Sequence, residues 1–352
     1  MEKRKSSIPT LQDVAKQAGV SVATASRILS NSSYPVSREL RKRVIRASQE
    51  LQYTPNHLGK MLKRNTAPAI GIIVPSLQNP FFNQVILGAE SAARGHDYEI
   101  IIFSSHRNVE QERRNILTLL QNRVMALIII SIDSNSHSLK NYIDCGGLVA
   151  LLESEFRMEG AISAENDYLE AGRIAAQHLV EMGHRDIAFL TSPLTKSYRR
   201  AILVGIEQTL QKIGKPLTEK DIFVANTEKE SDTGLYEFEL GKRLALDLLH
   251  SHRKYSAIIA INDITAFGII QALTQNGVSV PDQISVISFD NISYSEMISP
   301  PLTTVALPSS NIGYTACKML MDSLGSKADV LPGMSFRFPC HLEQRQSVKD
   351  IR

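Results

Sequence analysis

Apolar residues in the first fifty positions recur at the spacing of one helical face in three successive segments. Thr10 and Asp13 form a capping box that begins the first helix, and Gly19 is placed to end it. A second short helix is predicted over 21–29 and a third over 37–51. These segments predict a small all-α head.

Beyond residue 68 the pattern changes to short apolar runs that alternate with longer amphipathic segments. The runs, predicted as strands, are Ile70–Val74, Tyr98–Phe103, Leu127–Ile130, Leu148–Leu152, Ile187–Leu190, Ala257–Ile261 and Ile284–Phe289. The predicted helices include Phe82–Ala93, Glu110–Asn122, Tyr168–Met182, Tyr198–Ile213 and Ala266–Asn276, and a further helix is expected to run to Leu249. Strands of this kind predict parallel sheets covered on both faces. There are too many for one sheet, so we expect two doubly wound α/β subdomains.

A short segment joins the two parts. Pro55 ends the helical pattern of the head, and Asn56 can cap a further helix over 56–63. Such a short helix is not stable alone, and residues 64–68 have the composition of a linker.

Charge divides the chain at the same place. Of the 39 basic and 36 acidic residues of the chain, 13 and 4 lie within residues 1–64, a net charge of +9, which leaves −6 for the rest. A basic head on a mildly acidic body indicates a polyanionic partner for the head, although a disordered basic tail would carry the same charge.

Several classes of protein are not expected. No apolar run is long enough to span a membrane, no signal sequence follows the basic N-terminus, and three scattered cysteines predict no disulfides, so we expect a cytoplasmic protein. No glycine-rich nucleotide motif, serine nucleophile elbow or metal-ligand spacing occurs. We therefore expect neither an enzyme nor a cofactor or metal site.

The first two predicted helices have the spacing of a helix-turn-helix. Ala15 allows a close crossing, Gly19 makes the turn and Ala25 packs inward. The second helix then projects its other residues toward a major groove, where Arg27 can pair with guanine and hydroxyl groups can bind phosphate. The residues of the head predicted to contact DNA are Thr10, Ser21, Val22, Ala23, Thr24, Ser26 and Arg27.

The segment Leu11–Arg27, LQDVAKQAGVSVATASR, resembles the head of the lactose/galactose repressor (LacI/GalR) family, with Ala25 in place of the usual valine. The resemblance continues through the YTPN segment to Leu62. In that family the segment is a hinge helix that folds on DNA and pairs with its twin in the minor groove. The resemblance implies that Asn56, Gly59 and Leu62 contact DNA there, with Leu62 as a wedge between base pairs.

Motifs in the body resemble the same family in order along the chain: NPFF at 79–82, END at 165–167, GHRDIAF at 183–189, ND at 262–263, FDN at 289–291 and PLTTV at 301–305. The resemblance implies a two-lobed, periplasmic-binding-protein-like body in which the chain crosses between lobes three times. The predicted domains are a head over 1–55, a hinge helix and linker over 56–68, an N-terminal lobe over 69–165 with 306–332, and a C-terminal lobe over 166–305 with 333–352.

A ligand of such a body binds at the carboxyl ends of strands, between the lobes. Asn262 and Asp290 each end an apolar strand and, by resemblance, match polar effector-binding positions of the family. Phe81 and Phe82 can form an apolar wall against a ring. The predicted effector-binding residues are Asn79, Phe81, Phe82, Glu153, Arg200, Tyr236, Asn262 and Asp290.

Two departures from the family concern this pocket. Ile202 stands where relatives commonly place an arginine, so Arg199 or Arg200 is expected to substitute, unless the effector lacks the group that the arginine grips. One register of the long loop farther on puts Tyr236 at a ring-stacking position, and another puts Lys229 there.

Together these features predict a sequence-specific regulator, a repressor of carbohydrate-use genes that binds a pseudo-palindromic operator in double-stranded DNA as a homodimer. A small sugar or phosphosugar is expected to control it from the cleft. Two alternatives stay open, namely control by a protein corepressor such as a phosphocarrier protein, and control by a non-sugar effector. The sign of the response also stays open.

Overall fold

The structure is a computed structural model that describes residues 9–29, 36–51, 53, 67–96, 98–135, 137–154, 157–226, 236–325 and 334–352. The chain forms two compact units, Met1–Ala67 and Pro68–Arg352. Separate hydrophobic clusters stabilise the two units, so each is described by itself. Within the described ranges, no helix is both long enough and apolar enough to cross a bilayer.

The described part of the head is a bundle of three helices, α1 (Leu11–Ala18), α2 (Val22–Leu29) and α3 (Arg38–Glu50). The predicted capping box is present at the start of α1. Gly19 ends α1 at φ +62°, a conformation that glycine adopts without strain. Small side chains dominate the core and allow the helices to pack closely, and its buried members are Val14, Ala15, Ala18, Ala25, Ile28, Val44 and Ala47.

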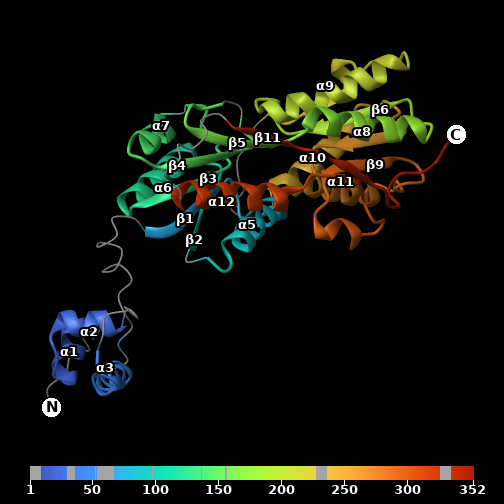
Figure 1. The fold of residues 1–352 in the computed structure, drawn as a ribbon. Helices are drawn as coiled ribbons and strands as arrows, with labels where there is room; N and C mark the ends of the chain where they lie inside the picture. Colours follow the sequence, from blue (N-terminus) through green and yellow to red (C-terminus); the bar gives the residue numbers. More distant parts are fainter. Residues whose placement is uncertain are drawn as a thin grey trace. The chain divides into compact units, whose positions relative to one another are not determined.

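The described part of the body contains two six-stranded sheets (Figure 1). The first has the order β11-β5-β4-β3-β1-β2. Its strands are β1 (Ala67–Val74), β2 (Glu99–Ser104), β3 (Val124–Ile129), β4 (Leu148–Leu152), β5 (Ala161–Asn166) and β11 (Ser335–Phe338).

The second sheet has the order β12-β10-β9-β8-β6-β7, with β12 antiparallel to β10. Its strands are β6 (Ile187–Thr191), β7 (Ile222–Val224), β8 (Ala257–Ala260), β9 (Ser285–Asp290), β10 (Thr303–Ala306) and β12 (His341–Glu343). Consecutive residues of one strand pack into different cores, since Phe189 belongs to one hydrophobic cluster and Leu190 to another. Both faces of the sheet are therefore buried.

Helices cover the sheets in pairs (Figure 1). In the first lobe α5 (Pro80–Ala93) packs on α12 (Ser309–Gly325), and α6 (Val109–Gln121) packs on α7 (His137–Asp144). In the second lobe α8 (Tyr168–Glu181) packs on α9 (Ser197–Lys212), and α10 (Tyr236–His250) packs on α11 (Asp263–Gln275). Two short 3-10 helices lie at Glu219–Asp221 and Ser293–Glu296.

The predicted fold class is confirmed for the described residues: helix-turn-helix helices precede two α/β subdomains. All the predicted body strands and helices occur, with boundaries shifted by a few residues. The prediction missed α7, α12 and the strands β5, β7, β10, β11 and β12. These strands are short or carry polar residues, so they lack the continuous apolar run that marks a fully buried strand. The predicted hinge helix lies outside the described residues.

One predicted boundary is wrong. Residues 335–338 form β11, which pairs in parallel with β5 in the first sheet, whereas the predicted C-terminal lobe began at residue 333. Only β12 joins the second sheet. The third crossing between the lobes therefore falls between Phe338 and His341.

Candidate functional site

The outer face of α2 in the head carries the residues predicted to read DNA. Val22, Ala23 and Arg27 are exposed, whereas Ala25 and Ile28 are buried. Ser21, just before the helix, is also exposed, and Thr24 and Ser26 are half-buried. This placement agrees with the projection expected of a recognition helix, while contact with DNA stays a prediction.

Hydroxyl groups at the helix starts of the head already have partners in the protein. Ser21 Oγ accepts a hydrogen bond from the Thr24 amide at 3.1 Å. Thr10 Oγ1 donates to Asp13 Oδ2 at 2.6 Å, and this bond lowers the pKa of the Asp13 carboxyl. Both hydroxyls thus fix the helix ends. The other predicted DNA contacts, Asn56, Gly59 and Leu62, lie outside the described residues.

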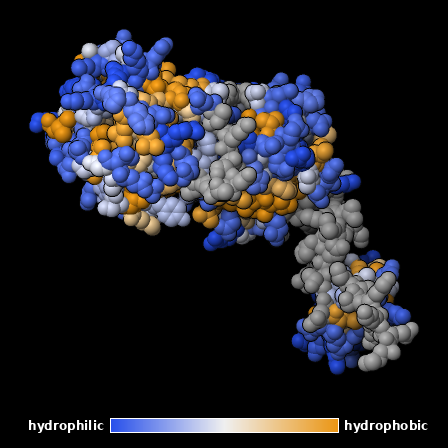
Figure 2. All heavy atoms as spheres, turned by 180° about the vertical axis from the view of Figure 1, so that it is seen from behind, coloured by the Kyte–Doolittle hydropathy of each residue, from blue (hydrophilic) through white to orange (hydrophobic). Residues whose placement is uncertain are grey.

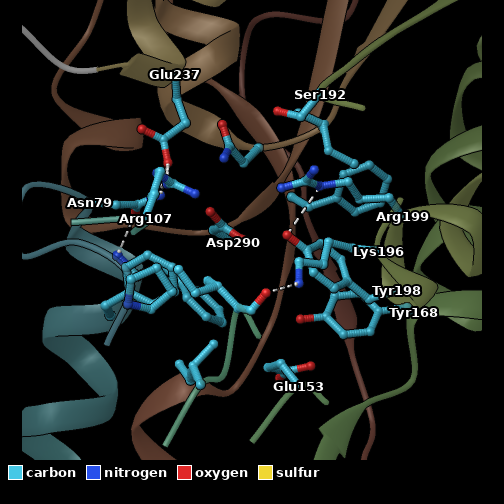
Figure 3. Close-up of a pocket in the computed structure, with 18 of the residues that line it drawn as sticks. Asn79, Arg107, Glu153, Tyr168, Ser192, Lys196, Tyr198, Arg199, Glu237 and Asp290 are labelled. Carbon is cyan, nitrogen blue, oxygen red and sulfur yellow. Dashed lines mark hydrogen bonds and ion pairs between the residues drawn. The ribbon is translucent and has the colours of Figure 1, made fainter. Parts of the chain in front are cut away.

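A cavity of about 390 Å³ lies within the body and is lined by residues of both lobes (Figure 3). Six of the eight predicted effector residues line it, namely Asn79, Phe81, Phe82, Glu153, Asn262 and Asp290. They come from strand ends and helix starts, as expected for an α/β cleft. The fold therefore brings six of the predicted residues, which are far apart in the sequence, to one cavity.

The second lobe supplies Asn262 and Asp290 to the cavity. Asn262 follows β8 and caps α11, because its Oδ1 accepts a hydrogen bond from the Thr265 amide at 2.9 Å. Asp290 ends β9 at φ +111°, a strained conformation for aspartate. Burial, followed by the charges of Asp263, Glu237 and Glu153, raises the pKa of Asp290 well above its usual range. A neutral Asp290 can both donate and accept hydrogen bonds.

The first lobe supplies an aromatic wall. Phe81 and Phe82 begin α5, and their ring centroids lie 5.6 Å apart with the planes at 80°. Asn79 caps this helix, with its Oδ1 accepting a hydrogen bond from the Phe81 amide at 3.0 Å. The cap thereby fixes the start of the helix that carries both rings.

Three polar contacts join the lobes beside the cavity (Figure 3). Glu237 of α10 forms a short ion pair with Arg107, and both side chains are almost completely buried. Asn79 Nδ2 donates to the same Glu237 oxygen at 3.1 Å, and Lys196 Nζ donates to the Ile132 carbonyl at 3.4 Å. These contacts link the two lobes at the cavity.

Two of the predicted effector residues do not line the cavity. Arg200 is exposed and donates to the carbonyls of Leu194 and Thr195, whereas Arg199 lines the cavity, because consecutive helical residues point in different directions. Tyr236 lies in a hydrophobic cluster with the Arg107 guanidinium 5.4 Å from its ring centroid, and it does not line the cavity.

Sequence reasoning also missed cavity residues. They are polar or aromatic side chains of the lobes: Arg107, Tyr168, Ser192, Lys196, Tyr198 and Glu237. Ile202 was identified only as a departure from the family, and it lines the cavity itself. The start of α9 was the available signal, since it follows a strand of the second sheet and carries several of these residues.

Comparison with known proteins identifies the class. Residues 67–344 match the family described as periplasmic binding proteins and sugar binding domain of LacI family, and residues 10–56 match the bacterial regulatory proteins of the lacI family. The chain therefore belongs to the LacI family, whose members combine a DNA-binding head with a ligand-binding body.

Individual relatives are similar in sequence to this chain over almost its whole length. The chain is 30% identical over 343 residues to the HTH-type transcriptional repressor PurR of Edwardsiella ictaluri, with 97% of each protein covered. It is 29% identical over 321 residues to PurR of Pasteurella multocida, covering 91% of this chain and 93% of the relative. Both relatives are named as transcriptional repressors, which indicates that this chain is a regulator.

Two solved structures share the fold. The lac repressor dimer bound to operator and the anti-inducer ONPF has a TM-score of 0.80 at 26% identity, covering 97% of this chain and all of the other. A LacI-family regulator of Enterococcus faecium with bound ribose has a TM-score of 0.69 at 25% identity, covering 81% of this chain and all of the other.

Proposed function

We propose that this chain is a repressor of carbohydrate-use genes that responds to a small sugar-like effector in the interlobe cavity. The observation that carries the proposal is the composition of that cavity. The Phe81 and Phe82 side chains provide apolar surface for a ring, while Asn262 and Asp290 offer hydrogen-bonding groups at the opposite strand ends. Sugars present an apolar face and many hydroxyl groups, so both kinds of surface would be used.

Ligand binding would act through the lobes. An effector that contacts both lobes favours one degree of closure over another, and only a ligand with different affinities for the two arrangements can shift them. We propose that this shift changes whether the hinge segments of two copies fold together on DNA. A coupling free energy of about 1–3 kcal/mol would be typical of such regulation.

The head would bind an operator as part of a homodimer in the cytoplasm. A single head offers few base-reading side chains, so two heads on a pseudo-palindromic site are needed for high affinity. The proposed partner surface lies on the first lobe, where Leu87 of α5, Ile102 of β2 and Tyr314 of α12 are exposed. Apolar residues gather in patches on the otherwise hydrophilic body (Figure 2).

A ligand screen tests the effector proposal. Thermal unfolding of the full chain would be followed with neutral sugars, phosphosugars and flat heterocycles, each with and without operator DNA. A sugar is expected to raise the unfolding temperature, because a ligand of the native state stabilises it. The difference made by DNA gives the sign of the coupling.

Two other outcomes would redirect the proposal. A heterocycle that shifts the unfolding temperature where sugars do not would indicate a non-sugar effector, since an aromatic wall stacks on flat rings as well. A protein corepressor is the second alternative, and it predicts that a phosphocarrier protein binds the body while no small molecule does.

A further inference from the structure

We propose that Glu153 is a neutral carboxylic acid that shares its single proton with the side-chain oxygen of Asn166. This acid–amide pair fixes the joint at which the chain first passes between the lobes, and it leaves that wall of the cavity uncharged. Glu153 is thereby a positioning and specificity-determining residue.

The two side chains lie at the joint itself. Glu153 follows β4 and lines the cavity, and Asn166 is the last residue of β5. The next residue, Asp167, caps α8 of the second lobe. Asn166 Nδ2 donates to Glu153 Oε1 at 2.8 Å, and the Glu153 amide donates to the Ala164 carbonyl at 3.0 Å. The end of β4 is therefore tied to the start of the crossing.

The other oxygens of the same pair carry the inference. Glu153 Oε2 and Asn166 Oδ1 are both buried, and neither has a hydrogen-bond partner among the residues that the structure describes. The whole side chains are also buried, with 8% of Glu153 and 2% of Asn166 exposed. An ionised Glu153 would leave two unsatisfied acceptors and a buried negative charge, each of which costs free energy.

A single proton removes this conflict. On Glu153 Oε2 it makes that oxygen a donor, and Asn166 Oδ1 is the acceptor that lacks one. The Tyr168 hydroxyl group interacts with both side chains, but it carries one hydrogen and can satisfy only one of the two oxygens. Protonation of Glu153 satisfies both.

The charged neighbours favour the same state. Burial raises the pKa of Glu153 to about 8, and the negative charge of Glu165 adds to this, while hydrogen bonding from Tyr168 and Asn166 opposes it. Glu165 on β5 is itself paired with Arg337 at 2.8 Å. Three groups of the second lobe face Glu153. Asp290 of β9 is one, and the charge of Glu153 contributes to its raised pKa. The other two are Tyr168 and Tyr198, whose ring centroids lie 5.1 Å apart.

The consequence for ligands rests on the proposed effector function, whereas the proton itself does not. An uncharged carboxyl group offers a hydroxyl group of a ligand a hydrogen-bonding partner but offers an ammonium group no opposite charge. Glu153 should therefore favour a neutral, hydroxylated effector over its amino-substituted counterpart near pH 7.

The proton is tested on the full chain without ligand. Glutamine can form the same two hydrogen bonds with Asn166 without a titrating group, so Glu153→Gln is expected to fold. In the unfolded chain Glu153 loses its proton near pH 4.3, and in the native state near pH 8. Between these values only the native state holds the proton, so wild-type stability falls as pH rises, relative to the variant.

The expected result is that the unfolding temperature of Glu153→Gln, minus that of the wild type, increases from pH 5 to pH 8. Above pH 8 this difference should stay constant. Tyr168→Phe is the control: it keeps the Glu153 carboxyl group, so the fall in stability with pH should persist, and it should extend to higher pH because the hydrogen bond from Tyr168 that lowers the Glu153 pKa is lost. The infrared band of a protonated carboxyl group should also weaken in Glu153→Gln at pH 7. A constant difference across this pH range, with no change in that band, would overturn the proposal.

The specificity is tested with glucose and galactose against glucosamine and galactosamine. At pH 7 a neutral sugar is expected to shift the unfolding temperature more than its amino analogue. A larger shift from the amino sugar that disappears in Glu153→Gln would contradict the uncharged wall. If none of the four compounds shifts the protein, the proposed effector class is in question while the pH profile still decides the proton.

Discussion

Two neighbouring aspartates at the second-lobe strand ends have different parts in the protein. Asp263 is completely buried and accepts hydrogen bonds from the hydroxyls of three residues, Ser288, Ser295 and Thr304, and from the Ile292 amide. Its oxygens are therefore committed to the fold. Asp290 lines the cavity and is available to a ligand. Of the two carboxyl groups, only that of Asp290 can be removed without loss of these buried hydrogen bonds, so Asp290 is the position at which to test the proposed effector site.

Asp290→Ala is expected to abolish the effector-dependent change in operator affinity and to leave operator binding without effector unchanged. Asp263→Ala is the matched comparison and should lower the free energy of unfolding by about 3 kcal/mol or more, because several buried donors lose their acceptor. Fluorescence anisotropy with operator DNA and denaturant unfolding measure the two effects. A normal response in Asp290→Ala would exclude this residue from the site.

Arg27 is the residue of the head with the greatest expected effect on sequence preference. It is exposed at the end of α2, and a bidentate contact between arginine and guanine contributes about 1–3 kcal/mol of discrimination. Arg27→Ala should therefore bind operator and scrambled DNA almost equally. Arg46→Ala removes the same charge from an 83% exposed side chain on α3 and should keep the preference. The measurement is the ratio of the two dissociation constants.

At the scale of elements, glycines set the distances between helices in the body. In each of three helix pairs, both helices have a glycine at the point where they cross. A Cβ added to any of these glycines would lie closer to a carbonyl oxygen of the other helix than van der Waals contact allows. The glycines are Gly88 and Gly313, Gly172 and Gly205, and Gly241 and Gly268. The helices that flank the cavity are therefore placed by backbone contacts.

Gly205→Ala tests this packing in α9, which carries the Arg199 side chain of the cavity. The new methyl group would meet the Leu169 carbonyl oxygen of α8, so the helices must separate. Overpacking of this kind typically lowers the free energy of unfolding by about 1–3 kcal/mol. Val204→Ala, at a 40% exposed position of the same helix, should change it much less. Urea unfolding of both variants distinguishes the two sites.

How far the sequence predicts the elements depends on whether the signal is local. The apolar runs of β1, β3 and β8 and the capping box of α1 are local, and the prediction found them. β11 is a short strand whose place depends on pairing with a distant strand, and local pattern does not specify that partner.

The same division applies to the cavity. Asn262 and Asp290 follow strongly apolar strands, so their place at the cleft was predictable. The Arg107–Glu237 pair joins residues 130 positions apart, and nothing in either segment specifies the other. The choice between Arg199 and Arg200 required the rotation of α9 about its axis, which a sequence pattern with mixed polar residues does not determine.

At the scale of the whole molecule, the buried Arg107–Glu237 ion pair links the two lobes. A buried ion pair contributes little net stability, but loss of one partner is costly because the other charge stays buried. We therefore propose that a ligand in the adjacent cavity changes lobe closure by altering the contacts of this pair. Asn79 has two structural roles beside this pair: its Oδ1 caps α5, and its Nδ2 donates a hydrogen bond to Glu237.

The proposed homodimer depends on a free sheet edge in the first lobe. β2 is the edge strand next to β1, and β1 is where the chain enters the body, so a symmetric contact through β2 would bring the entry points of two copies close together. That proximity is what paired hinge segments require. Ile102 of β2 is 43% exposed, and an exposed apolar residue on an edge strand favours association with another chain.

Ile102→Lys is expected to convert the protein to monomers, because a desolvated lysine at the centre of a symmetric contact faces its own copy. Operator affinity should fall steeply, since each monomer then binds one half-site. Val224→Lys is the matched control, with a 39% exposed valine on β7, the corresponding edge strand of the second sheet. Sedimentation velocity gives the oligomeric state, and anisotropy gives the affinity. A dimer that survives Ile102→Lys but dissociates in Val224→Lys would place the interface on the second lobe, where paired hinges would need another explanation.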